Sequence, residues 1–207
     1  MPALLSVNQN GFLKAFASCD LYEISLPSLT STQSYAFKEA FRDNHNLTSV
    51  SAPSLTSTNT QVFADAFVNC SNLVSVEVGT AGSHVVAQGM FLNSSGQSSG
   101  TRWSLTLGDV TLIDSQAFSN NSSIELIDFR TCSSVPTLNN VNAFTGVAAL
   151  TCVIPDYLDG AWQSTGNWPT LLENNPEVMI VAGSQYFIEE EPPPEEEPGE
   201  EDGGDGE

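Results

Sequence analysis

Basic residues are scarce in this chain of 207 residues, which has five lysines and arginines and two histidines. Proteins that bind nucleic acids or anionic membranes need clustered lysine and arginine to meet the phosphate groups. The 25 acidic residues give a formal net charge of −20, and 11 of them lie in residues 189–207. The rest of the chain has 14 acidic residues against five basic ones, a balance of −9. We therefore expect neither nucleic acid nor an anionic membrane as a partner.

Long hydrophobic runs are also absent, since no apolar stretch approaches the roughly 20 residues that cross a bilayer as a helix. The first five residues lack the basic region and the apolar core of a secretory signal peptide. We expect no membrane insertion and no export directed by such a signal. The abundance of serine, threonine and asparagine is typical of proteins at the cell surface, in the extracellular space or on virions, and a virion protein would leave the cell by lysis.

Cysteine occurs only four times, and no pair has the CxxC spacing of a zinc or redox site. Cys19 and Cys70 occupy the same position in two repeats that one other repeat separates. At about 4.8 Å per neighbouring strand they should lie about 10 Å apart, beyond the ~7 Å that a disulfide spans. We predict buried free thiols at both positions. Cys132 and Cys152 lie in adjacent repeats at different positions, so the sequence allows their pairing without favouring it.

A catalytic constellation is equally hard to find. Nucleophilic catalysis needs a base beside a serine or cysteine, but His45 is predicted in a surface turn and His84 in a solvated loop between repeats. Glycoside hydrolysis needs two carboxylates about 5 to 9 Å apart. Glu23 lies two repeats before Glu77, and Asp128 lies two repeats after it, so neither pair is adjacent. The sequence therefore predicts a protein without enzymatic activity, metal or cofactor.

What the chain has in abundance is one short signature, a phenylalanine preceded by alanine or, once, by methionine. Six copies recur at intervals of 24 to 27 residues, at Phe16, Phe41, Phe67, Phe91, Phe118 and Phe144. A repeat of this length is one supersecondary unit that cannot bury its apolar side alone, so neighbouring repeats must stack. The chain is predicted to be a solenoid with these phenylalanines in a single file. Such a fold presents a surface and does not enclose a pocket.

Each repeat has two parts. After the phenylalanine come an aliphatic residue and then a β-branched residue, followed in four copies by another apolar residue two positions later, which predicts a short strand. The β-branched residues are Ile24, Val50, Val76, Ile127 and Val153. Before the phenylalanine, Phe12, Phe37 and Phe63 complete the pattern Phe-x-x-Ala-Phe, whose i and i+4 spacing fits one face of a helical turn. We therefore expect an α/β solenoid with one short parallel strand and one helical turn per repeat.

The fourth repeat departs from this pattern. Met90 replaces alanine, and residues 94–100, rich in serine and glycine, are inserted before its strand, which we expect at residues 102–107. Insertions in solenoids form loops on one face. The composition favours a flexible surface loop over a recognition element.

The consensus sequence of the repeat, A-F-x-x-[NC]-x-x-L-x-x-[IV]-x-L-P, resembles the BspA-type leucine-rich repeat of bacterial, protist and phage-encoded proteins. The resemblance covers residues 11–155 in six phased copies, about seven tenths of the chain. It implies adhesion or protein binding and no chemistry. The segment at 154–168 also looks like the short helical cap that closes such arrays.

These patterns divide the chain into a leucine-rich repeat solenoid (residues 1–155), a C-terminal cap (156–188) and a disordered acidic tail (189–207). The cap is expected to start with a short helix at 156–163 and to bury Trp162 and Trp168 over the last repeat. No cap precedes the first repeat. Leu4, Leu5 and Val7 suggest a partial repeat there, through which the protein could self-associate.

The outward positions of the strands are the expected binding surface. They are small, hydroxylated or acidic, and include Cys152 and Ile154 in the last repeat; aromatic anchors, which dominate binding hot spots, are missing from them. The candidate binding residues on and beside this surface are Tyr22, Glu23, Glu77, Arg102, Trp103, Asp128 and Arg130.

The leading hypothesis is a non-enzymatic module that binds, or adheres to, a protein or glycan on a cell surface. The alternative is a structural spacer in a phage particle or surface array. A carbohydrate-active β-helix enzyme is less favoured, because its repeats would each show several strands.

Overall fold

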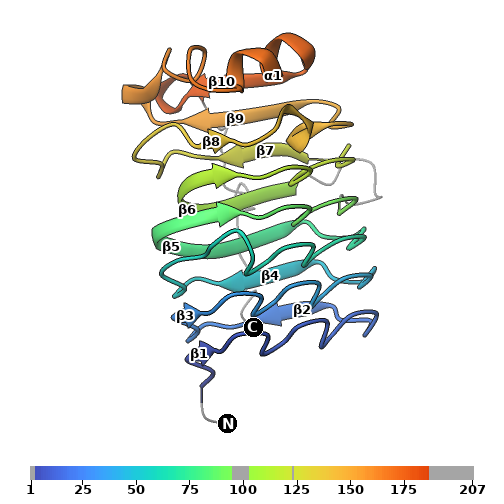
Figure 1. Ribbon diagram of the computed structural model, residues 1–207. Helices are drawn as coiled ribbons and strands as arrows, with labels where there is room; N and C mark the ends of the chain where they lie inside the picture. The colour runs from blue at the N-terminus through green and yellow to red at the C-terminus, as the bar shows by residue number, and fades with distance from the viewer. Residues whose placement is uncertain (1–2, 95–102, 123, 187–207) are drawn as a thin grey trace, which may run out of the picture.

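The computed structural model describes residues 3–94, 103–122 and 124–186. The chain coils into turns that stack from the N-terminal end, with β1 and β2, to the C-terminal end, where α1 lies over the last turns (Figure 1). The strands are β1 (Ser6–Val7), β2 (Glu23–Ser25), β3 (Ser31–Thr32), β4 (Ser49–Ala52), β5 (Ser75–Val86), β6 (Trp103–Ile113), β7 (Ile124–Asp128), β8 (Thr137–Leu138), β9 (Leu150–Ile154) and β10 (Val178–Ala182). The helices are α1 (Trp168–Asn174) and the 3₁₀ turns η1 (Val141–Phe144), η2 (Asp156–Leu158) and η3 (Gly183–Gln185).

One parallel sheet runs along the solenoid in the order β2-β4-β5-β6-β7-β9-β10, with β8 paired to the far part of β6. β1 and β3 form a second, two-stranded parallel sheet. The repeats are in register, so one inward position recurs from strand to strand and is buried at every step. It holds Ile24, Val50, Val76, Leu105, Ile127 and Cys152. The predicted solenoid is confirmed.

The signature phenylalanines form a continuous file of stacked rings. Neighbouring centroids from Phe16 to Phe144 are 5.1 to 5.8 Å apart, with interplanar angles of 18° or less. A second file beside it joins Phe12, Phe37 and Phe63 at 5.5 and 5.3 Å. The single file predicted from the spacing is therefore confirmed, and it forms the spine of the core.

A helical turn in each repeat is not found, and the α/β class is not supported: among the described signatures only the sixth, at Phe144, lies in a helical turn, the 3₁₀ turn η1. The Phe-x-x-Ala segment is a β-turn: Ala15 donates its N–H to the carbonyl of Phe12, and the third residue of the turn, Lys14, has a φ of 56°. A positive φ at that position is what a type II turn requires. The turns at 37–40 and 63–66 repeat this geometry, with φ of 52° at Glu39 and 54° at Asp65.

The backbone hydrogen bonds explain why turns replace a helix. Every second N–H of this segment bonds within its own repeat, and the N–H groups between them donate to the next repeat. Thus Phe12 donates to Ala36 at 2.9 Å and Phe16 donates to Ala40 at 2.9 Å. An α-helix would use all of these groups internally, whereas this turn run ties neighbouring repeats together on the side opposite the sheet.

Hydroxyl side chains add further ties between repeats, which gives a structural role to the many serines and threonines. Thr48 and Thr56 donate their Oγ1 hydroxyls to the backbone carbonyls of Tyr22 and Thr30 in the preceding repeat, both at 3.0 Å. The same contact to a preceding repeat is made by Thr30, Ser54, Thr111 and Thr131.

The third and fourth repeats have longer strands than the sequence predicts, because the chain does not reverse at Gly79. β5 continues through Gly79, which has a φ of 56°, and resumes pairing with β6 at Ser83 after a register shift. His84 is buried there, so the predicted solvated loop is wrong. A Cβ at Gly79 or Gly108 would lie within 2.4 or 2.8 Å of the His84 ring, so only glycine leaves room for it. Residues 95–100 of the predicted insertion lie outside the described residues, as does residue 102, the first of the strand expected after it.

The C-terminal cap differs in detail from the prediction. Only the short turn η2 forms within residues 156–163, and the cap's α-helix, α1, begins later, at Trp168. Trp162 and Trp168 are fully buried against each other, with centroids 4.5 Å apart, as expected for the core of a cap. β10 then pairs with β9 and extends the sheet by one strand. This strand was not predicted from the sequence. Residues 187–207, including the predicted acidic tail, lie outside the described residues.

Candidate binding surfaces: the sheet face and the N-terminal end

The outward side of the main sheet carries two rows of residues, fixed by the strand register. By register, one row runs through Glu23, Ser49, Ser75, Ser104, Leu126 and Thr151, and the other through Ser25, Ser51, Glu77, Thr106, Asp128 and Val153, of which Val153 is buried. Cys152 and Ile154 were expected in these rows, but both are fully buried. The last repeat is shifted by one residue relative to the expectation, because Cys152 pairs with the buried Ile127.

Two polar contacts on this face involve the candidate residues Glu77, Asp128 and Arg130. Ser51 donates its hydroxyl to Oε2 of Glu77 at 3.1 Å. Arg130 forms a two-point ion pair with Asp128, with Nε 3.0 Å from Oδ1 and Nη2 2.6 Å from Oδ2. The Asp128 carboxylate raises the pKa of Arg130 by hydrogen bonding and by its charge. The Arg130 side chain remains half exposed and offers a fixed cation just after the end of β7.

Several of the candidate binding residues suggested by the sequence lie apart from one another in the structure. Glu77 and Asp128 share a row but lie on β5 and β7, with β6 between them, and Glu23 belongs to the other row. Tyr22, directly before β2, is 68% exposed. Trp103 is the first residue of β6, and Arg102 lies outside the described residues. The carboxylates are therefore spaced two strands apart, as the sequence predicted.

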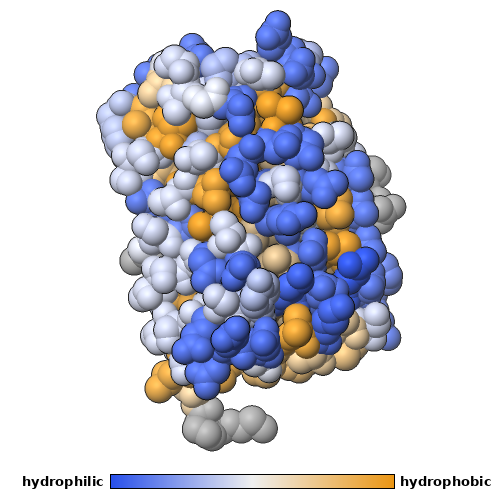
Figure 2. Space-filling view, viewed as in Figure 1, coloured by the Kyte–Doolittle hydropathy of each residue, from blue (hydrophilic) through white to orange (hydrophobic). Residues whose placement is uncertain are grey.

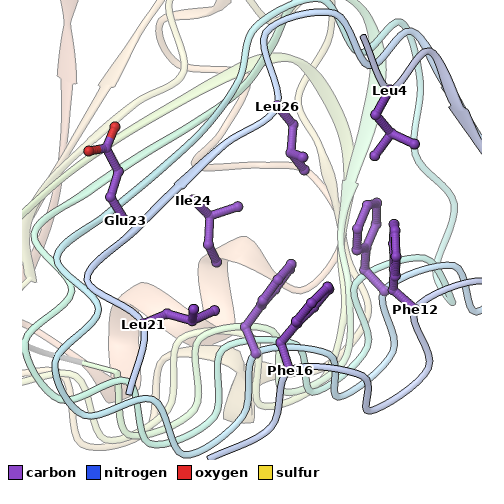
Figure 3. Close-up of a pocket in the computed structure, with 9 residues that line it drawn as sticks. Leu4, Phe12, Phe16, Leu21, Glu23, Ile24 and Leu26 are labelled. Carbon is purple, nitrogen blue, oxygen red and sulfur yellow. The ribbon is translucent and has the colours of Figure 1, made fainter. Parts of the chain in front are cut away.

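The second surface is the N-terminal end of the solenoid, where a hollow of about 180 Å³ opens under the first repeat. It is lined by Leu4, Phe12, Phe16, Leu21, Glu23, Ile24, Leu26, Phe37 and Phe41. Figure 3 shows the phenylalanine rings and the aliphatic side chains turned toward this space, while Glu23 points away from it. In Figure 2, hydrophobic surface follows much of the lower edge, which is this end of the molecule, below a largely hydrophilic body.

The two ends of the molecule differ in how far their apolar side chains are covered. At the C-terminal end the tryptophans of the cap are fully buried, whereas at the N-terminal end Leu5 is 59% exposed and Leu13 40% exposed. The sequence signalled this end through the missing N-terminal cap, but it did not reveal a hollow. The hollow exists because the N-terminal residues do not fully cover the side chains of the first repeat, and the sequence does not show how far they cover them.

The four cysteines are free, as predicted for Cys19 and Cys70, but Cys19 is exposed and the expectation of burial there is wrong. Cys70 is buried and donates its thiol to the carbonyl of Phe41 in the preceding repeat at 3.2 Å. Cys132 and Cys152 are buried and not paired. Burial raises the pKa of Cys70 and of Cys132 to about 12, and it raises the pKa of Cys152 as well.

These thiols give a direct check of the fold. At about pH 8 a thiol-specific reagent should label Cys19 in the native protein and leave the other three unreacted, because thiolate is the reactive form and the buried thiols stay protonated. All four should react in denaturant. Peptide mapping of the labelled sites is the measurement, and rapid native labelling of Cys152 would contradict the packing described here.

The described residues contain no group of three or more histidine, cysteine, aspartate or glutamate side chains that could hold a metal ion. None of the helices in the described part of the chain could cross a bilayer. In the part of the chain that the structure describes, the surfaces open to a partner are therefore the rows of the sheet and the N-terminal hollow.

The fold defines the chain as a solenoid repeat protein with one parallel sheet along its length. Comparison with protein families matches the BspA type leucine rich repeat region in six copies over residues 13–151. The chain belongs to this family, as the consensus sequence of its repeats indicated. Comparisons with curated proteins and with solved structures give no match. Its solenoid is consistent with a protein-interaction repeat module.

Proposed function

We propose that the chain is a non-enzymatic binding or adhesion module that presents its main sheet to a protein or glycan on a cell surface. The observation that carries this proposal is the register of seven parallel strands. Along β2, β4 and β5 it lines up small hydroxyl and carboxylate residues at intervals of about 4.8 Å. Repeat solenoids commonly bind partners on such extended surfaces.

Within this face, the candidate contact residues are Tyr22, Glu23, Glu77, Arg102, Trp103, Asp128 and Arg130. The ion pair between Asp128 and Arg130 supports the choice of these two residues as contact residues. Arginine is enriched at binding hot spots, and the ion pair holds this one in a fixed position. The exposed ring of Tyr22 offers a second anchor at the other end of the sheet. A location on the cell surface, in the extracellular space or on a virion fits this role.

The alternative is a structural spacer in a phage particle or surface array. The observation that favours it is the uncovered N-terminal end, where a further component of such an assembly could pack. A carbohydrate-active enzyme has less support, because Glu77 and Asp128 lie on strands separated by β6.

The binding proposal is tested by selection against the full chain with a random-peptide display library and, in parallel, a glycan array. We expect ligands whose affinity falls at least about ten-fold in Arg130→Ala or Asp128→Ala, because a charged anchor at a binding site is worth about 1.4 kcal/mol or more. Glu173→Ala, an exposed change on α1 away from the sheet, is the matched control and should leave the affinity unchanged. Ligands that bind all three variants equally would remove the sheet face from the proposal.

A further inference from the structure

The turn runs give the solenoid a direction. In each pair of adjacent repeats the N–H groups of the earlier repeat donate to carbonyls of the later one. In the first pair, Asn10, Phe12, Lys14, Phe16 and Ser18 donate to Ser34, Ala36, Lys38, Ala40 and Arg42. The second pair follows the same rule, with Phe37, Glu39 and Phe41 donating to Val62, Ala64 and Ala66. The carbonyls that receive these bonds therefore face the N-terminal side of their own repeat.

The first described repeat has the same carbonyls, and none of the described residues forms a repeat before it. The positions that correspond to Ser34, Ala36, Lys38 and Ala40 are Gln9, Gly11, Leu13 and Ala15, one repeat earlier. Among residues 3–94, 103–122 and 124–186, none donates a hydrogen bond to these four carbonyls. All four residues are exposed. The N-terminal end therefore presents a row of hydrogen-bond acceptors at every second residue.

This acceptor row borders the apolar hollow. Phe12 and Phe16 are partly buried, and each stacks on a ring of the second repeat, at 5.5 and 5.8 Å. Their other sides belong to the hollow, where one further pair of rings would continue both files (Figure 3). Leu4, at 37% exposure, borders the same space.

A partner for this end must therefore offer N–H groups at every second residue and apolar side chains four residues apart. We propose that the N-terminal end is a docking site for a phenylalanine-bearing segment of another polypeptide, which adds one further turn to the solenoid. The segment donates its N–H groups to the carbonyls of Gly11, Leu13 and Ala15 and places its rings on Phe12 and Phe16. Addition of a backbone segment to an open edge is a recurring mode of peptide recognition.

A second copy of this chain does not meet these requirements. A two-fold axis that joins two N-terminal ends sets one acceptor row against the other, so neither row receives donors. A head-to-tail contact needs an open ring at the C-terminal end of the phenylalanine file, and there Trp168 packs on Phe144 with centroids 6.0 Å apart and both are fully buried. The occupant is therefore a segment of a different polypeptide, and this inference is independent of the sheet face.

The probe is a synthetic, fluorescein-labelled peptide of residues 31–52 of this same chain, which carries the repeat pattern with Phe37 and Phe41. Its binding to the full-length protein is measured by fluorescence anisotropy. We expect saturable binding and at least a ten-fold loss of affinity when the N–H groups of Phe37, Glu39 and Phe41 are methylated. These are the groups that donate to the next repeat in the native fold, and methylation leaves every side chain in place.

On the protein side, Leu4→Glu places a charge at the hollow and should weaken peptide binding at least ten-fold. The matched control is Leu5→Glu, because Leu5 is more exposed and does not line the hollow. Circular dichroism and thermal melting establish that both variants fold. Arg130→Ala should bind the peptide normally, which separates this result from failure of the sheet-face proposal.

Three results would overturn the inference. They are an absence of saturable binding when the protein is titrated into the labelled peptide, equal binding of the methylated and unmethylated peptides, and a dimer of the free protein that Leu4→Glu dissociates in sedimentation analysis. The last result would assign the N-terminal end to a second copy.

Discussion

Replacing Phe67 by alanine should lower the free energy of unfolding by about 3–5 kcal/mol, the range for removing a large aromatic side chain from a closed core. Phe67 is fully buried in the middle of the phenylalanine file. Its ring stacks on Phe41 at 5.5 Å and on Phe91 at 5.7 Å, nearly parallel to both. The neighbouring repeats are held by the sheet and by the turn run, so they cannot close the cavity.

The matched control is Phe16→Ala, the same change at the open end of the same file. Phe16 has a file neighbour on one side only, Phe41, and its ring borders the N-terminal hollow. We expect a loss of less than half that of Phe67→Ala, because the removed side chain was already partly exposed. Urea unfolding followed by circular dichroism measures both. Equal losses would mean that the file does not act as a continuous spine.

The stacking of repeats was predictable from the sequence because burial imposes a strict pattern on it. Each repeat must supply an aromatic and an aliphatic side chain to the same core, so Phe41, Phe67 and Phe118 recur at nearly constant spacing. The strands followed from the same logic, since the two-residue step around Val50 and Val76 fits only an extended chain with one side buried.

The turn run was not predictable from that spacing. Side chains at i and i+4 share one face of an α-helix, but they also share one face of successive four-residue β-turns. Phe12 and Phe16 therefore fit either conformation. The difference lies in where the N–H of Phe12 bonds, and its acceptor, Ala36, is in the next repeat. Sequence spacing carries no information about such a bond, so the helical prediction failed.

The details of the binding surfaces depend on register, which a single residue can shift. Val153 has the β-branched side chain expected at an inward position, yet Cys152 takes that position, because β9 pairs with β7 through Ile127 and Cys152. The prediction of a solvated loop at His84 was wrong because β5 continues past Gly79. The longer strand brings the His84 ring against the backbone of Gly108. The acceptor row at the N-terminal end depends on backbone direction and could be found only in the structure.

Replacing Asn44 by alanine is expected to destabilise the protein by roughly 3 kcal/mol or more, because each buried polar group left without a partner costs about 1–3 kcal/mol. Asn44 is fully buried between the first two repeats. Its Oδ1 accepts from the N–H groups of Cys19 and Leu21 at 3.1 and 3.0 Å. Its Nδ2 donates to the carbonyls of Phe16 and Phe41, both at 2.8 Å. Alanine at this position leaves all four backbone groups without these bonds.

The position of Asn44 determines where the effect should appear. The bonds to Cys19, Leu21 and Phe16 hold the first repeat on the second, so hydrogen exchange should quicken most in residues 3–30 and urea unfolding should shift to lower concentration. Asn139→Ala is the control, because Asn139 is exposed and its side chain makes a single bond, to Asp114 at 2.9 Å. We expect a loss of less than about 1 kcal/mol there. If the two alanine variants unfolded at the same urea concentration, the ties between repeats would have to lie in the strands and rings alone.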